Sequence, residues 1–240
     1  MYAWCERARA AVAKRTYVAA TMSQAFLELW ATGLFKLVVN SAVLGSIELE
    51  CGDKEACEPQ FTFPAVLVTV FLLVVFLAFG TGAHVNPTIS VAAMAAGMLP
   101  LTHGIARIAA QVVGVTLAMI ALRALAPERL HKHVAPPIPL DPTWALAVEA
   151  IFAYTNVIAA FGCGIWGRYK AAVTASIVLV EICISGAQMD PLGAFAGSYF
   201  QGDWRHHLEV YWTGSLVGAL LAGVTWRVVQ SLSSPKSKPA

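Results

Sequence analysis

Apolar residues occur in long runs separated by short polar segments, and the lengths of these runs predict membrane-spanning helices. The run from Phe61 to Gly80 contains 20 residues without a charge, roughly the length that crosses a hydrocarbon core. Comparable stretches are expected to span at about 22–47, 104–125, 143–165, 170–186 and 207–230. Six crossings place both termini on one side of the membrane.

Two further apolar segments are too short to cross. One begins at Pro87 and stops at Leu99-Pro100, and the other begins at Pro191 and stops at Gln201-Gly202. At about 1.5 Å per residue, some ten residues cover roughly half a bilayer. Because free backbone ends cannot face lipid, we expect these half-helices to be buried in protein or to line a water-filled cavity.

Each half-helix begins within a copy of the same sequence motif. The copies are Thr81-Gly-Ala-His-Val-Asn-Pro-Thr88 and Ser185-Gly-Ala-Gln-Met-Asp-Pro-Leu192. Asn86 and Asp190 suit the N-cap, and Pro87 and Pro191 suit the first helical position. Short elements in corresponding positions of two halves are typical of an inverted repeat with its working site at the bilayer midplane. Since each half has three crossings, the halves are antiparallel and the two caps meet head to head.

The predicted fold is therefore an all-α membrane protein with six transmembrane helices and two re-entrant half-helices. A hydrophobic share of 58% and a charged share of 12%, with a mean hydropathy of +0.66, exclude an ordinary soluble domain. We expect a cytosolic segment at 1–20, a first half at 21–130 with its half-helix at 87–98, a second half at 131–230 with its half-helix at 191–200, and a basic cytosolic tail at 231–240.

Two acidic residues occupy matching places in the halves. Glu28 lies in the first span and Glu149 in the fourth. An acid within a span is costly and usually faces the bundle interior. We expect each to accept hydrogen bonds from backbone N–H groups of a re-entrant loop; the alternative is solvation near an interface.

These motifs resemble the aquaporin (major intrinsic protein) family over about residues 20–230. The resemblance rests on Gly-Ala-His-Val-Asn-Pro, the two glutamates, Ala110-Gln111-Val-Val-Gly114, and Tyr211-Trp212-Thr-Gly214-Ser-Leu-Val-Gly218. Within the family the chain is most similar to the unorthodox branch of plant small basic intrinsic proteins and animal superaquaporins. Its first box, Asn86-Pro87-Thr88, suits that branch. The second box, Asp190-Pro191-Leu192, departs from it.

The resemblance implies one pore per subunit, a homotetramer, and a constriction toward the outer or lumenal mouth. It also implies that His84 serves the first loop through its backbone carbonyl. The implied filter positions are Val66, Val178, Ala187 and Gly193. Water-selective members carry Arg at the position of Gly193 and His at that of Val178. A ring without charge or donors is expected to be wider and less selective.

Asp190 is the sharpest departure from the family pattern. An ionised carboxylate only accepts hydrogen bonds, and it would partly neutralise the positive helix ends. Asp190→Asn is then expected to reduce cation or proton leak. In the alternative, Asp190 is an N-cap turned into the loop, and Asn86 alone serves the pore.

The remaining charged residues and histidines give weaker indications of function. Lys36 and Glu181 lie inside predicted spans, and one interpretation is that they form an ion pair between subunits. The favoured interpretation is that Lys36 snorkels to an interface and Glu181 serves a polar cavity. His131, His133, His206 and His207 are interpreted as solvated loop residues, so neither a metal site nor a cofactor is expected.

Charge placement predicts the orientation. Basic residues precede the first span, lie between the fourth and fifth, and follow the sixth, which makes both termini cytosolic. These residues are Arg7, Arg9, Lys14, Arg15, Arg168, Lys170, Arg227, Lys236 and Lys238. The tail resembles a dilysine retrieval signal, which favours the endoplasmic reticulum or another intracellular membrane over the plasma membrane. Cys51 and Cys57 lie in the opposite acidic loop, where a disulfide is left open.

The expected function is that of a passive channel for water, hydrogen peroxide and small neutral solutes such as glycerol. Neither enzymatic activity nor a nucleic-acid partner is expected. Two other classes remain: a cation-conducting channel or secondary transporter that uses a midplane Asp190, and a membrane enzyme or scaffold with a closed pore.

Overall fold

The computed structural model describes residues 2–52, 62–134, 140–162, 169–185 and 188–233, and its regular elements there are all helical. The α-helices are α1 (Tyr2–Cys51), α2 (Thr62–Leu73), α3 (Phe79–Thr81), α4 (Pro87–Ala95), α5 (Leu101–Leu125), α6 (Pro142–Phe161), α7 (Lys170–Ser185), α8 (Pro191–Gln201), α9 (Trp204–His206) and α10 (Thr213–Ser233). Two π-helical segments, η1 (Val74–Ala78) and η5 (His207–Trp212), and a 3₁₀ helix, η2 (Glu128–His133), connect some of them.

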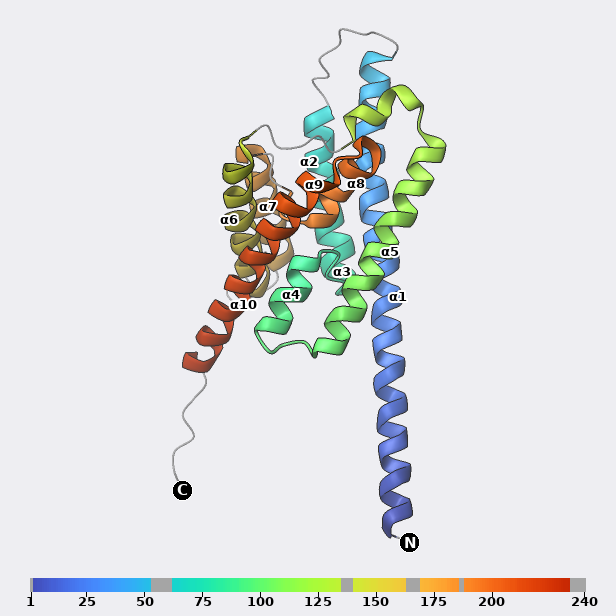
Figure 1. The fold of residues 1–240 in the computed structure, drawn as a ribbon, viewed down its shortest axis with the longest axis vertical. Helices are drawn as coiled ribbons and strands as arrows, with labels where there is room; N and C mark the ends of the chain where they lie inside the picture. Colours follow the sequence, from blue (N-terminus) through green and yellow to red (C-terminus); the bar gives the residue numbers. More distant parts are fainter. Residues whose placement is uncertain (1, 53–61, 135–139, 163–168, 186–187, 234–240) are drawn as a thin grey trace.

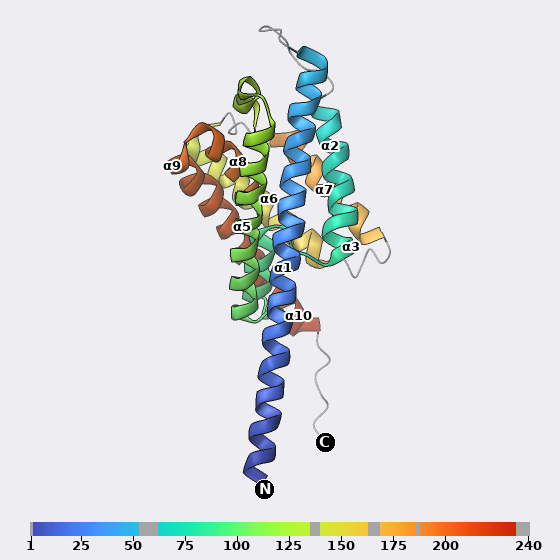
Figure 2. The same cartoon turned by 90° about the vertical axis from the view of Figure 1, so that its right-hand side faces the viewer.

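Long apolar helices form the body of the molecule. Within the described residues, five helical stretches are long and apolar enough to cross a membrane: Tyr17–Cys51, Thr62–Thr81, Leu101–Leu125, Pro142–Phe161 and Trp204–Ser233. Helix α7, with 16 residues, lies where the remaining crossing is expected but is shorter than these. The N-terminal end of α1 and the C-terminal end of α10 lie at the same end of the bundle, beyond which α1 extends (Figures 1 and 2).

The two half-helices lie between these long helices. Helix α4 has 9 residues and α8 has 11, and Figure 1 shows α4 in the lower part of the bundle and α8 in the upper part. Helix α4 ends at Ala95, before the expected end at residue 98, because Gly97 takes a φ of 73° and turns the chain toward α5.

Glycines let the helices of each half approach one another at backbone distance. A Cβ placed on Gly114 of α5 would lie 2.3 Å from the carbonyl oxygen of Leu29 in α1. In the second half, a Cβ on Gly218 of α10 would lie 2.1 Å from the carbonyl oxygen of Ala150 in α6. Real Cβ atoms do not fit at these distances, so each crossing requires glycine.

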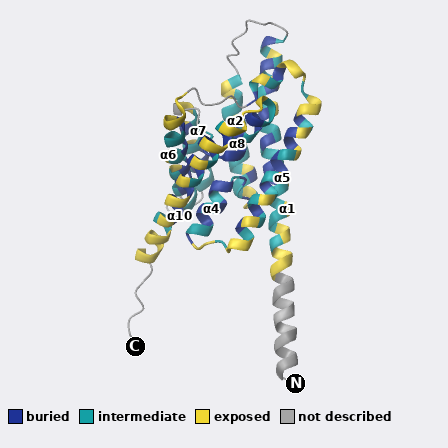
Figure 3. Cartoon of the chain, viewed as in Figure 1, coloured by how far each residue is buried: buried dark blue, intermediate teal, exposed yellow. Residues whose placement is uncertain are grey.

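Burial follows the same plan. Buried positions gather around the half-helices and on the inward sides of the long helices (Figure 3). The outer surface carries large apolar side chains, including Phe26 and Phe76, each 71% exposed. Such a surface is suited to lipid rather than water.

Candidate functional site

The N-caps of the two half-helices lie next to one another. The Asn86 side chain accepts from the Thr88 backbone N–H at 2.8 Å, and Asp190 accepts from the Leu192 N–H at 3.0 Å. The Asn86 amide also donates to the carbonyl oxygen of Met189 at 3.0 Å. The head-to-head meeting of the caps expected from the repeat is therefore confirmed.

Each loop makes an unusual turn just before its cap. Val85 has a φ of 59° and Met189 a φ of 52°, in the left-handed region that β-branched and bulky residues rarely adopt. Such strain persists only where surrounding contacts impose it. The same conformation at the same place in both halves indicates one shared loop geometry.

Glu28 and Glu149 supply those contacts. Glu28 accepts from the backbone N–H groups of His84 and Val85, at 2.7 and 2.9 Å. Glu149 accepts from those of Gln188 and Met189, at 2.6 and 2.8 Å. Both glutamates are 0% exposed, so the alternative of solvation near an interface is wrong.

Further partners of the glutamates differ between the halves. Arg107 donates to Glu28 at 2.7 Å and Gln111 donates to it at 2.8 Å, whereas Ser215 donates to Glu149 at 3.2 Å. Our reading of the sequence missed Arg107. The available signal was an arginine inside an apolar span, four residues before Gln111 and hence on the same helix face.

Lys36 pairs with Asp190. The ammonium of Lys36 in α1 lies 2.5 Å from Asp190 Oδ2, and the two side chains are 8% and 9% exposed. The expectation that Lys36 snorkels to an interface is therefore wrong. A buried carboxylate without a partner is strongly destabilising, so the cap position of Asp190 draws the lysine inward.

The expected filter positions are partly described. Gly193 lies beside this pair: its added Cβ would be 2.6 Å from Gln188 Oε1 and 3.5 Å from Lys36 Nζ. Val178 packs beside Met189 in an apolar cluster, and Val66 is half-buried in α2. Ala187 lies outside the described residues. The four side chains carry no charge, but a charge and donors lie next to Gly193.

His84, besides its backbone bond, places its ring Nδ1 2.9 Å from Ser90 Oγ in α4. This contact ties the first loop to its own half-helix. Because the ring is engaged inside the protein, the side chain contributes to support of the loop.

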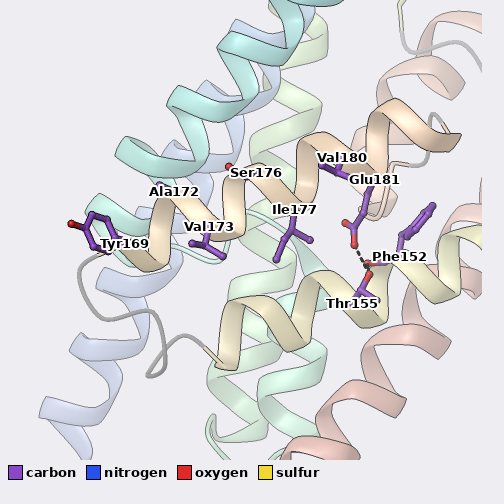
Figure 4. Close-up of a pocket in the computed structure, with 9 residues that line it drawn as sticks. All are labelled: Phe152, Thr155, Tyr169, Ala172, Val173, Ser176, Ile177, Val180 and Glu181. Carbon is purple, nitrogen blue, oxygen red and sulfur yellow. Dashed lines mark hydrogen bonds between the residues drawn. The ribbon is translucent and has the colours of Figure 1, made fainter.

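Glu181 lies on a groove of about 710 Å³ between α6 and α7. Its carboxylate accepts a hydrogen bond from Thr155, and Figure 4 shows the two side chains pointing toward one another among apolar lining residues. The groove is open and mostly apolar rather than the polar cavity expected. Cys51 is disulfide-bonded, but Cys57 lies outside the described residues.

Comparison with known proteins identifies the family that has this architecture. The family model described as "Major intrinsic protein" matches residues 13–226. The chain belongs to the major intrinsic protein family. The aquaglyceroporin of Plasmodium falciparum has a similar fold, with a TM-score of 0.62 at 14% identity over 89% of this chain and 96% of that one.

Relatives of this major intrinsic protein include plant aquaporins. Aquaporin SIP1-1 of Zea mays is 30% identical over 72% of this chain and 79% of its own length, and that of Oryza sativa subsp. japonica is 31% identical over 72% and 80%. Probable aquaporin TIP4-2 of Oryza sativa subsp. japonica is 27% identical, and the match spans 62% of each protein. The small basic branch is thus among the relatives, in agreement with the boxes in the sequence.

Proposed function

We propose that this major intrinsic protein is a passive channel for water and small neutral solutes, including hydrogen peroxide and glycerol. The observation that carries the proposal is the meeting of two half-helix N-caps, where the Asn86 amide lies 3.0 Å from the Met189 carbonyl. Helix N-termini direct backbone N–H groups and positive potential toward this point. Such a point favours a neutral oxygen-bearing solute and disfavours a cation.

The proposed pore centre combines polar and apolar groups. Asn86 supplies amide donors, and Thr88 supplies a hydroxyl whose oxygen lies 2.8 Å from the Asn86 side-chain oxygen. Pro87, Pro191 and Leu192 begin the half-helices and are buried, and Leu192 packs in an apolar cluster, so we assign them the apolar frame behind the polar groups of the pore centre. Glu28, Glu149 and His84 hold the loops, a supporting role rather than a contact with the solute.

The proposed outer filter comprises Val66, Val178, Ala187 and Gly193. Small and apolar side chains leave a wider passage than an arginine would. This composition supports passage of solutes larger than water, glycerol among them.

The cation channel or transporter reading relies on an available carboxylate at Asp190. Both oxygens of that carboxylate have protein partners, Leu192 N–H and the Lys36 ammonium. Because Leu192 and Lys36 already engage the carboxylate, we do not expect Asp190 to act as an exchangeable cation site. The cation leak expected from an unpaired Asp190 is therefore not expected in the unmodified protein.

The proposed setting is a homotetramer in the endoplasmic reticulum or another intracellular membrane, with both termini cytosolic. The basic segments that flank the spans support this orientation. Blue-native electrophoresis tests the tetramer, and a protease-protection assay on microsomes tests the orientation of the termini. Dimers or monomers, or a lumenal N-terminus, would contradict them.

The function itself is tested with purified protein in liposomes. Stopped-flow light scattering after an osmotic step measures water and glycerol permeability, and an entrapped dye measures hydrogen peroxide entry. We expect all three rates to exceed those of protein-free vesicles. Asn86→Leu, which removes the amide donors, should lower all three rates; unchanged rates would contradict the proposed pore centre.

A further inference from the structure

Helix α1 contacts both halves of the site from one side. Glu28 accepts from the first loop at His84 N–H, 2.7 Å away, and Lys36, eight residues further on, reaches the cap of α8. Eight residues are about two turns, so the two side chains share a face and lie about 12 Å apart along the axis. The charges of Glu28 and Lys36 therefore lie at different points of the region where the N-caps of α4 and α8 meet.

The charges at the meeting point of the two half-helix N-caps can be counted. Each half-helix N-terminus contributes roughly +0.5 elementary charge, about +1 for the two. An ionised Asp190 cancels this potential, and the Lys36 ammonium, 2.5 Å from Oδ2, brings the sum back to about +1. With Lys36 present, the point has the sign that two neutral caps would give it.

The Lys36 ammonium also lies beside the first turn of α8. A Cβ on Gly193 would lie 3.5 Å from Nζ and 2.6 Å from Gln188 Oε1, so the Gln188 side chain fills the space that a larger residue at position 193 would take next to the ammonium. An ammonium has three N–H donors, and Asp190 accepts one. Asp190 has exchanged the donors of an asparagine for acceptors, and Lys36 supplies donors at the same place.

The geometry points to Lys36 as the residue that sets the charge selectivity of this channel. Lys36 restores the positive potential that Asp190 removes, and it supplies the N–H donors that a carboxylate lacks. Cations are excluded at the meeting point, while neutral solutes pass. This inference rests on the proposed channel function.

The test uses purified full-length protein in planar bilayers and in vesicles under a potassium chloride gradient. The variants are Lys36→Met, Asp190→Asn and the double variant, with Lys36→Arg as the charge-conserving control. Lys36→Met should raise the potassium-to-chloride permeability ratio at least about tenfold, which corresponds to about 1.4 kcal/mol in the barrier. Asp190→Asn should shift the ratio toward chloride, because the ammonium then stands alone. The double variant and Lys36→Arg should lie near the unmodified protein.

Lys36→Met leaves a buried carboxylate without its partner, which endangers folding. If that variant does not reach the membrane, Asp190→Asn and the double variant carry the test, since both lack the carboxylate. Asn caps a helix about as well as Asp. The chloride preference of Asp190→Asn should then disappear when Lys36→Met is added.

Equal ratios in Asp190→Asn and the double variant would overturn the role of Lys36, as would a Lys36→Met channel as impermeable to potassium as the unmodified protein. Osmotic water permeability is measured on the same vesicles. Failure of the unmodified protein to conduct water would contradict the proposed function instead. Intact water permeability with unchanged ion ratios would contradict only the inference about Lys36.

Discussion

The second re-entrant loop depends on the carboxylate of Glu149, and replacing Glu149 by Gln tests that dependence. The carboxylate accepts from Gln188 N–H at 2.6 Å on one oxygen and from Met189 N–H at 2.8 Å on the other. A glutamine has one acceptor oxygen and one NH₂ group. Its NH₂ group must therefore face one of the two backbone N–H donors.

The expected loss follows from these bonds. One buried N–H without an acceptor costs about 1–3 kcal/mol, and the remaining bond loses its charge assistance, about 1 kcal/mol more. The sum is about 2–4 kcal/mol. At about 2–4 °C per kcal/mol for a chain of this size, the melting temperature should fall by about 4–16 °C.

Glu181→Gln is the matched control. Glu181 is also buried, at 4% exposure, but its partner Thr155 donates through a hydroxyl, which the oxygen of a glutamine accepts equally well. Thermal unfolding of both variants in the same detergent is followed by size-exclusion chromatography of heated samples. Water permeability in liposomes should fall with Glu149→Gln and change little with the control. Equal melting temperatures for the two variants would refute the proposed loop support.

Two further substitutions test the filter and the packing. Gly193→Arg should lower glycerol and hydrogen peroxide permeability more than water permeability, and it should lower stability modestly because it adds a cation beside Lys36; unchanged solute rates at equal expression would mean that this ring is not the filter. Gly218→Val should lower the melting temperature, because the added Cβ meets the Ala150 carbonyl at 2.1 Å, whereas Gly45→Val, with space of 4 Å around its Cβ, should stay close to the unmodified protein. Similar melting temperatures for these two variants would contradict the close crossing of α6 and α10.

Local sequence signals predicted the elements of this fold well. The apolar runs, the Asn-Pro and Asp-Pro caps and the short lengths after Pro87 and Pro191 all act within a few residues. The family and the helical fold are confirmed. The ends of the helices were less predictable. Helix α4 stops at Ala95 because of the turn at Gly97, and helix propensity alone does not determine such an end point.

Two ion pairs between distant residues were not predicted from the sequence, although the contacts of Glu28 and Glu149 with the loops were. The pairs Lys36–Asp190 and Arg107–Glu28 join residues 154 and 79 positions apart, and hydropathy does not say which face of a helix turns toward a cap. Lys36 was expected to snorkel because the long apolar stem of a lysine lets its ammonium reach an interface from within a span. The filter and pore roles of the remaining residues stay predictions, because they concern solutes rather than contacts within the chain.

The most direct measurement of the central claim is osmotic water flux through the unmodified protein in liposomes at several protein-to-lipid ratios. A passive channel predicts that permeability rises in proportion to the protein content and depends less on temperature than that of protein-free vesicles. The flux should also proceed without an ion gradient. Permeability equal to that of protein-free vesicles at every ratio would contradict the account.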